Sequence, residues 1–263
     1  MRLLALALAL FLVPQDEKIT LRFNPKPGDK LTQTTKMEMK LKITIDAGGG
    51  SQDVEVEQRG TEKTATEIVE VTAGKLTKVV KDFIEDYEEE KAPGMEEWKR
   101  KDNPLHGRKV TISMKDGKLV REGAEGLKEK ELKKLDLEDK ESQILPKEPV
   151  RVGDTWDVKG EDVRKWLAAE KLTDGKVKLK LVAIKEVDKL RCAMIQGTFD
   201  LIGKAEGDVE LALKFDADLI VWIDRGYTLS VKGKGKVTVK GDGGGAPMSG
   251  EGPITIDRST KVE

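Results

Sequence analysis

Cysteine and histidine are almost missing from this chain of 263 residues, which has one of each, Cys192 and His106. A lone cysteine excludes an internal disulfide, and one cysteine with one histidine is too few for the usual three or four protein ligands of zinc. A histidine-activated nucleophile would have to use His106, which we expect to lie in a loop. Cys192 lies in an alternating stretch, 190–195, and we expect it to be a small buried apolar residue.

Aromatic residues and net charge are also scarce. Aromatics make up 4% of the chain, and 48 Lys and Arg nearly balance 49 Asp and Glu, which leaves a net charge of −1. Base stacking needs aromatic rings and phosphate backbones need a positive field, so we expect no nucleic acid partner. The glycine runs 48–50 and 243–245 lack the Lys-Ser/Thr of a phosphate loop and are typical of hairpin loops.

No catalytic motif remains after these exclusions. We therefore expect no enzymatic activity, no cofactor and no metal ion. A glycosidase that uses acids alone stays open, since it needs two carboxyl groups only about 5 to 10 Å apart. Acids do cluster at Glu85-Asp86 and at Glu88-Glu89-Glu90, where oxygen ligands would suit a hard cation, but a solvated charge run is the simpler interpretation. The whole stretch 85–103 is expected to be an exposed loop or short helix.

The only long apolar run is at the N-terminus. Met1-Arg2 followed by the run from Leu3 to Val13 is typical of a secretory signal, and it is shorter than the roughly 20 residues that span a bilayer. We expect a signal peptide over 1–15, cleaved near Gln15, and an exported protein, periplasmic or extracellular. An uncleaved signal anchor is the alternative. No cysteine follows the run, so a bacterial lipoprotein has no acceptor there.

Alternation of apolar and polar residues predicts long strands in the first half of the chain. Odd positions from Leu31 to Ile45 are largely apolar. The returning stretch 53–72 changes parity between Val56 and Val69, which predicts a bulge near Gly60. A third strand is expected over 76–87, and a hairpin over 109–122 around Asp116-Gly117, a strong turn signal.

The second half alternates more strictly. From Val209 to Ile223 every odd residue is apolar, and after the turn at 224–226 the parity continues from Tyr227 to Val239. A face of lysines and threonines opposite an apolar face is typical of an antiparallel meander with one wet side. Pro253 to Val262 is expected to be the last strand.

Two segments have helical character, 126–145 and 162–172. We therefore predict an α+β fold, mainly antiparallel β, with a long curved sheet (a half-barrel or open barrel) and the two helical segments against its concave apolar face. Residues 16–145 would form an N-terminal β-rich half with a helix and 146–263 a C-terminal β-meander half, or both one continuous domain. We expect Trp156 and Trp166 to fill the inside of the sheet.

A repeated phrase marks the start of each half. Leu145-Pro146-x-x-Pro149-Val150-x-Val152-Gly153-Asp154-x-Trp156 follows the same order as Phe23-Asn24-Pro25-Lys26-Pro27-Gly28-Asp29 upstream, with an extended approach, a Gly-Asp turn and a strand start. This phrase resembles a family of uncharacterised exported bacterial proteins, many from planctomycete-like lineages. The resemblance implies an exported β-rich protein and carries no active-site residues. The layout also resembles the open half-barrel carriers of lipids and lipoproteins in the bacterial periplasm, in architecture only.

The apolar concave face leads to our functional hypothesis, a non-catalytic exported protein that binds an apolar ligand, a lipid or acyl chain, under the curved sheet. The predicted lining residues are Met37, Met39, Leu211, Leu213, Phe215, Leu219, Val221, Leu229 and Val231. The alternative is a structural or protein-interaction module of the cell envelope, with an envelope protein as partner, in which these residues form a closed core.

Overall fold

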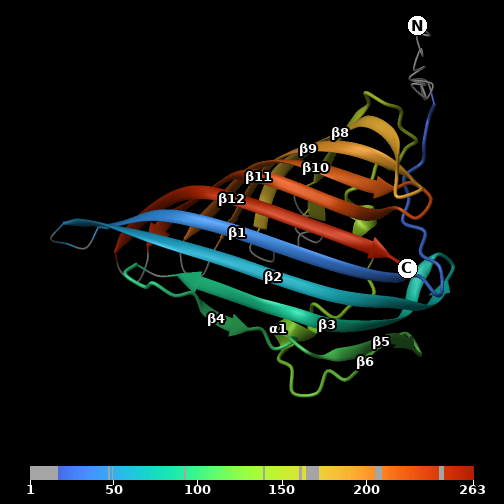
Figure 1. Ribbon diagram of the computed structural model, residues 1–263, viewed down its shortest axis with the longest axis horizontal. Coiled ribbons are helices and arrows are strands. Elements are labelled where there is room, and N and C mark those ends of the chain that lie inside the picture. The colour runs from blue at the N-terminus through green and yellow to red at the C-terminus, as the bar shows by residue number, and fades with distance from the viewer. Residues whose placement is uncertain are drawn as a thin grey trace, which may run out of the picture.

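One antiparallel sheet of twelve strands forms the body of the molecule (Figure 1). The computed structural model describes residues 17–46, 48, 50–91, 93–138, 140–159, 162–163, 172–204, 209–242 and 246–263. The strand order is β6-β5-β3-β2-β1-β12-β11-β10-β9-β8-β7, with β4 paired to β3 beside this path, and the sheet does not close on itself.

The strands divide into two meanders. The N-terminal half contains β1 (Lys30–Asp46), β2 (Ser51–Thr72), β3 (Lys75–Lys91), β4 (Lys99–Asp102), β5 (Lys109–Lys115) and β6 (Lys118–Glu122). The C-terminal half contains β7 (Thr155–Lys159), β8 (Leu172–Val187), β9 (Leu190–Lys204), β10 (Glu210–Trp222), β11 (Tyr227–Asp242) and β12 (Pro247–Val262). Because β1 pairs with β12, the two meanders share one continuous sheet.

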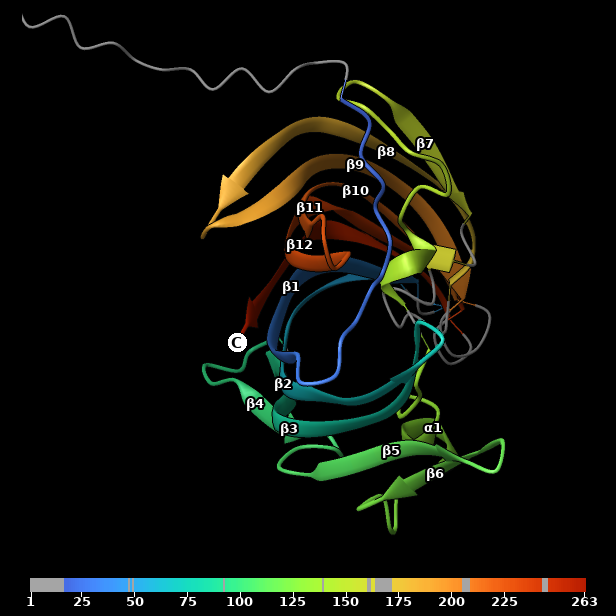
Figure 2. The same cartoon turned by 90° about the vertical axis from the view of Figure 1, so that its right-hand side faces the viewer.

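The sheet curls so that its two edges, β6 and β7, approach the same open side (Figure 2). Residues 123–154, here called the crossover, connect these edges across that side. Residues 17–29, here called the strap, run along the concave face from β7 toward the start of β1 (Figure 2). The strap and the crossover pair with each other, since the N–H groups of Ile19 and Val150 each donate to the other's carbonyl at 2.8 and 2.9 Å.

The predicted helix over 126–145 is wrong for most of its length. The crossover contains only α1 (Glu129–Leu132) and a 3₁₀ turn, η1 (Glu141–Gln143). Its leucines are spaced by five, three and two residues (127, 132, 135 and 137), which keeps no single helical face. The carbonyl of Leu135 instead accepts from Arg121 Nε at 2.6 Å, which holds the segment against β6. The second predicted helix, 162–172, lies outside the described residues except 162, 163 and 172. The fold is thus mainly antiparallel β, and the described residues contain one short α-helix.

No described helix has the length and apolar character that crossing a membrane requires. The predicted signal peptide, 1–15, lies outside the described residues.

The prediction of an exposed loop or short helix over 85–103 is wrong for much of this stretch. β3 continues to Lys91, and β4 pairs with it. Glu88, Glu89 and Glu90 stand directly opposite Lys101, Arg100 and Lys99. Opposite charges at facing positions stabilise antiparallel pairs. The acidic run therefore has basic partners on the neighbouring strand. Among the described residues no cluster of acids, histidine or cysteine has the arrangement of a metal site.

The first Gly-Asp phrase is a tight turn docked on a neighbouring strand. Asp29 N–H donates to Lys26 O at 3.1 Å across Pro27 and Gly28, whose φ of 90° is the positive value that a type II turn needs. The Asp29 carboxylate accepts from Lys26 N–H at 2.9 Å. Gly28 N–H donates to Ile68 O at 2.7 Å, and Ile68 N–H donates to Asp29 O at 2.9 Å, so the turn extends the sheet beside β2.

The second phrase repeats this arrangement. Asp154 N–H donates to Arg151 O at 3.0 Å, Gly153 has a φ of 99°, and the Asp154 carboxylate accepts from Arg151 N–H at 3.0 Å. Gly153 N–H donates to Leu181 O at 2.8 Å, and Leu181 N–H donates to Asp154 O at 3.0 Å. The same turn therefore docks on β8 as on β2.

Each strand that pairs with a Gly-Asp turn has a bulge directly after the paired residue. The pairing register shifts after Ile68 in β2 and after Leu181 in β8, where Val69 and Val182 are the extra residues. The predicted bulge near Gly60 is wrong, because the β1–β2 register passes that residue without a shift. The change of parity instead occurs where the turn ends its pairing with β2.

Two apolar clusters lie on the concave face. The cluster of the C-terminal half surrounds the stacked rings of Phe199 and Phe215, whose centroids are 4.4 Å apart, and it includes Leu21 of the strap and Ile144 of the crossover. Trp156 packs against it as predicted and donates from Nε1 to Ile144 O at 2.9 Å, whereas Trp166 lies outside the described residues.

Cys192, near the start of β9, is buried as predicted and free. Burial raises the pKa of its thiol, which keeps the group protonated.

The cluster of the N-terminal half is smaller and built around Ile68, Val79, Phe83 and Leu135.

Candidate functional site

Polar side chains interrupt the apolar concave face of the N-terminal half at matching register positions. Gln33 of β1 stands between Thr64 of β2 and Thr260 of β12. One step along, Thr35 stands between Glu62 and Arg258. Facing residues in an antiparallel pair lie on the same side of the sheet, so these interruptions combine into one polar patch that crosses three strands.

A cavity of about 560 Å³ lies over this patch. One part of its lining is apolar and the rest polar or charged. The apolar residues include Phe23, Leu31, Met37, Ile68, Leu76, Val79, Phe83, Leu105, Tyr227, Val231 and Ile256. The polar residues include Gln33, Thr35, Glu62, Thr64, Thr66, Lys81, Asp86, Asn103, Thr228, Arg258 and Thr260, with Lys134, Asp136, Glu138 and Lys140 from the crossover. The sequence pattern predicts an apolar concave face, and this prediction is wrong where the cavity lies, because polar and charged side chains line part of it.

The strap contributes one aromatic side chain, Phe23, to the lining of the cavity. Phe23 packs edge-on against Tyr227, with ring centroids 5.6 Å apart. The Tyr227 hydroxyl donates to the Asp29 carboxylate at 2.8 Å, and Arg225 Nε approaches the same carboxylate at 3.4 Å. The Gly-Asp turn thus fixes both the strap and the aromatic wall of the cavity.

Asp86 closes the acidic side of the cavity. Its side chain is buried, and its carboxylate accepts from Asn103 Nδ2 at 2.7 Å. Its backbone N–H donates to Nδ1 of His106, which lies in the loop between β4 and β5, at 3.1 Å. Since Nδ1 accepts a hydrogen bond, it carries no proton in this arrangement. The single histidine therefore anchors the loop to β3.

Lys81 and Arg258 are the cations that the sheet itself presents to the cavity. The Gln33 amide, with its oxygen turned toward the guanidinium, accepts from Arg258 Nη2 at 2.6 Å. Lys81 is half-buried. Burial, and then the positive charge of Lys140, lower the pKa of Lys81, while Asp136 and Glu62 act in the opposite direction.

The predicted lining residues are distributed over both halves. Met37 and Val231 line the cavity, and Leu229 packs against the N-terminal cluster. Phe215, Leu219 and Val221 are buried in the C-terminal cluster, with Leu213 packed against it. Met39 and Leu211 are part-buried further along the same strands and are not among the residues that line the cavity.

Sequence reasoning did not single out the polar lining residues, although parity marks them. If Leu31 and Met37 face inward, so do Gln33 and Thr35. If Ile254 and Ile256 face inward, so does Arg258. Each exception looks minor in its own strand, and only the register shows that the exceptions are neighbours.

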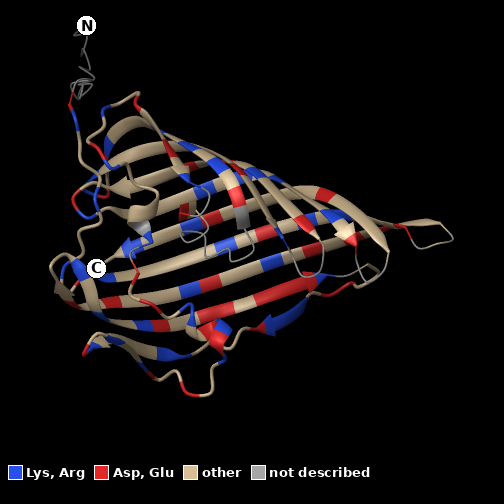
Figure 3. Ribbon diagram, turned by 180° about the vertical axis from the view of Figure 1, so that it is seen from behind, with Lys and Arg blue, Asp and Glu red and all other residues tan. Residues whose placement is uncertain are grey.

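Residues of both charge signs are interspersed along the strands of the sheet (Figure 3), and the strand registers pair opposite charges on its outer face. In one line across the sheet Lys36 faces Asp257, Asp257 faces Lys232, and Lys232 faces Asp218. These residues border a hollow of about 1110 Å³ on that face. Neighbouring opposite charges offset one another, so this face presents no field of one sign.

No protein-family model and no curated protein matches the chain. Similar solved structures include DynF from the dynemicin biosynthesis pathway of Micromonospora chersina, with 10% identity, 92% of this chain and 84% of that chain covered, and a TM-score of 0.23. They also include the COG4313 outer membrane channel from Pseudomonas putida F1, with 9% identity, coverage of 92% and 98%, and a TM-score of 0.23. A DUF1329 family protein from Desulfovibrio piger has 10% identity, coverage of 86% and 83%, and a TM-score of 0.15. At these TM-scores the function has to be argued from the side chains of the cavity.

Proposed function

We propose that this chain is a non-catalytic exported protein that binds one amphipathic ligand, a lipid or an acyl chain with a polar end, in the cavity of the N-terminal half. The observation that carries the proposal is the cavity of about 560 Å³, whose lining joins apolar side chains to the polar patch on one face. Ligand sites of proteins commonly have volumes of about 300 to 1,000 Å³ and combine apolar walls with a few placed polar groups.

The division of the lining favours an amphipathic ligand over a purely apolar one. Leu31, Ile68 and Val79 would pack against the chain, while Thr64, Gln33 and Thr260 would lie beside the polar end. A ligand without polar groups would leave the buried Thr260 hydroxyl, which makes no hydrogen bond with the described residues, without a partner, and this costs free energy.

The proposal includes the absence of catalysis. Its support is that the single histidine already accepts a backbone N–H and that the single thiol is buried. Asp86 already accepts from Asn103, which leaves it poorly suited to be one of two free carboxyl groups. Export remains a proposal that rests on the N-terminal apolar run of the sequence.

Native mass spectrometry of gently purified protein tests the binding proposal. We expect added mass that organic extraction removes, and a fluorescent fatty acid probe that competes with the extracted material. A Val231→Trp variant fills the cavity from β11 and should lose both signals. Leu201→Met, a substitution in the C-terminal core, is the control that should keep them. Wild-type protein with no added mass and no probe binding would overturn the proposal.

A structural or protein-interaction role in the cell envelope is the second candidate. The observation in its favour is that the strap and crossover fill the concave face of the C-terminal half, where Ile19, Leu21 and Ile144 are buried against the sheet. Under this alternative a protein partner co-purifies in fixed stoichiometry and no small molecule is extracted.

A further inference from the structure

Lys81 is placed where a structural lysine is unfavourable. It lies in the middle of β3, faces the cavity, and is half-buried beside Val79 and Phe83. Within the described part of the chain its ammonium group makes no hydrogen bond and no ion pair. An ammonium taken from water without a partner costs free energy, so the fold by itself gives no reason for a cation here.

The acids nearest to Lys81 already have partners. Asp136 pairs with Lys140 at 3.5 Å in the crossover, and Glu62 accepts from the Thr64 hydroxyl at 3.3 Å. Lys140 adds a second positive charge near the ammonium and, after burial, is the next cause of its lowered pKa. Lys81 and Lys140 therefore stand near Asp136 and Glu62 in equal number, and of these four side chains only Lys81 has neither a hydrogen bond nor an ion pair with a described residue.

Neutral donors lie on the same wall. Thr66 stands directly opposite Lys81, and Leu31 stands directly opposite Thr66 on the next strand. Further along the patch, the hydroxyl of Thr260 is buried and makes no hydrogen bond with the described residues. An acidic oxygen beside Lys81 would have a hydroxyl within reach, and an attached chain would continue onto Leu31 and Ile68.

We propose that Lys81 binds the carboxylate of a single-chain fatty acid, whose chain lies toward Phe23, Leu31 and Ile68. This inference rests on the proposed function and specifies its ligand. A monoanion fits better than a dianionic phosphate, because the same cavity contains Glu62, Asp86 and Asp136, whose charges would repel a second negative charge.

The test compares a fluorescent fatty acid, cis-parinaric acid, with its methyl ester. We expect wild-type protein to bind the acid about tenfold more tightly than the ester, the ratio expected for one charge-assisted hydrogen bond. Lys81→Met should remove that ratio by weakening acid binding alone and leave the ester affinity unchanged. The melting temperature of Lys81→Met should be equal to or higher than that of wild type, because the variant removes a buried unpaired charge.

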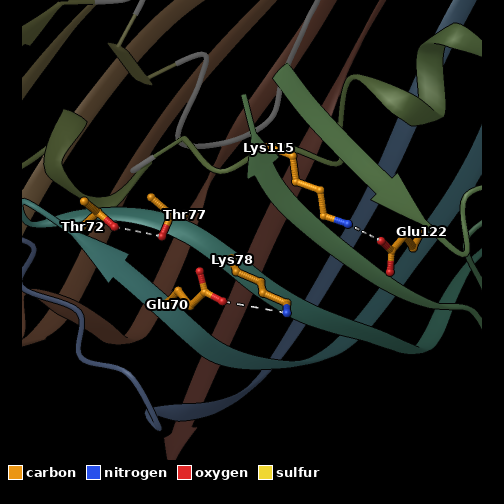
Figure 4. Close-up of polar contacts among 6 residues, drawn as sticks. All are labelled: Glu70, Thr72, Thr77, Lys78, Lys115 and Glu122. Carbon is orange, nitrogen blue, oxygen red and sulfur yellow. Dashed lines mark hydrogen bonds and ion pairs between the residues drawn. The ribbon is translucent and has the colours of Figure 1, made fainter. Parts of the chain in front are cut away.

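Lys78→Met is the matched control. Lys78 is on the same strand but outside the cavity lining, and it reaches Glu70 on β2 at 3.9 Å (Figure 4). The same chemical change there should alter neither affinity. Lys81→Arg, which keeps the charge, should retain part of the preference for the acid.

Three results would overturn the inference. Equal binding of acid and ester by wild type would reject the carboxylate site and leave the proposed function intact. A ratio that persists in Lys81→Met would reject Lys81 as its cause. Failure of wild type to bind either compound would reject the inference together with the proposed function.

Discussion

The two halves of the sheet begin with the same docked turn and differ in what covers their concave faces. In the C-terminal half the line Val231, Leu219, Ile195 and Leu181 crosses four strands with aliphatic side chains only. The same line continues through Arg258 of β12 and then into the N-terminal half through Thr35, Glu62 and Asp86. The change occurs between β11 and β12 without any break in the hydrogen-bonded ladder. The backbone therefore sets the curvature, while the inward side chains decide between a closed core and a cavity.

Glycine supports the closed half by making room for aromatic rings. At Gly197 an added Cβ would lie 2.6 Å from Leu179 and 2.7 Å from Phe199, so these side chains pack directly over its backbone. Gly233 faces Phe215 in the same way, with an added Cβ at 3.3 Å from that ring. The stacked pair of Phe199 and Phe215 thus packs closely on the sheet, in the same cluster as Ile19 and Leu21 of the strap.

The largest expected effect separates the two cores. Phe215 and Phe83 are each 5% exposed, one in each half. Phe215→Ala should lower the free energy of unfolding by about 3 to 5 kcal/mol, because it leaves a void among residues that cannot collapse. Phe83→Ala should cost less, since its ring already borders the cavity. Urea unfolding followed by circular dichroism measures both, and equal losses would contradict the distinction between a closed and an open half.

The two docked turns should respond alike even though the cores differ. Gly28 and Gly153 have φ of 90° and 99° and open space where a Cβ would go. Gly28→Ala and Gly153→Ala should therefore each cost about 1 to 2 kcal/mol, the strain of a positive φ in a residue with a side chain. Chemical denaturation of the pair is the measurement. A loss confined to one variant would show that only that turn is needed for its half.

Local patterns predicted much of this fold. Strict alternation over 209–239 gave the inward face of β10 and β11, and Asp116-Gly117 gave the β5–β6 hairpin, with positive φ at both residues. The prediction of a long helix in the crossover was wrong, because its leucines pack against the N-terminal cluster without sharing one helical face. The prediction of a loop for the acidic run was also wrong. That run is part of β3, and the basic residues of β4 form a strand only by pairing with it.

Long-range pairing is what no local pattern contains. The contact between β1 and β12 joins residues near opposite ends of the chain, such as Thr35 and Arg258, and nothing in either strand specifies the other. The polar patch depends on that pairing. Gln33, Thr64 and Thr260 become neighbours only through two strand registers, so the sequence identified an inward face and missed the site on it.

The pH dependence of stability should differ between wild type and Lys81→Met. Burial lowers the pKa of Lys81 in the folded chain, so the unfolded chain binds this proton more tightly than the folded chain does. The stability of wild type should therefore rise with pH between the lowered pKa and the ordinary lysine pKa of the unfolded chain, and below that window the cost of the charged form is fully present. Urea unfolding of both proteins from about pH 7 to about pH 10 reports the difference. A difference that stays constant with pH would mean that Lys81 is not desolvated.

The smallest expected effect concerns the outer edge of the N-terminal half, which is held by charge where the C-terminal half is held by apolar packing. Glu89 faces Arg100 across β3 and β4, and the Arg100 guanidinium lies over the Tyr87 ring at 3.7 Å. A double-mutant cycle with Glu89→Gln and Arg100→Gln should give a coupling of about 0.5 kcal/mol, since exposed facing ion pairs contribute little. Sodium chloride at high concentration should reduce that coupling, because exposed charges are screened. A coupling that salt leaves unchanged would assign the pairing of β4 to the Arg100–Tyr87 stack and to backbone hydrogen bonds. In that case the facing charges would favour β4 over other segments as the partner of β3 but would add no measurable stability to the pair.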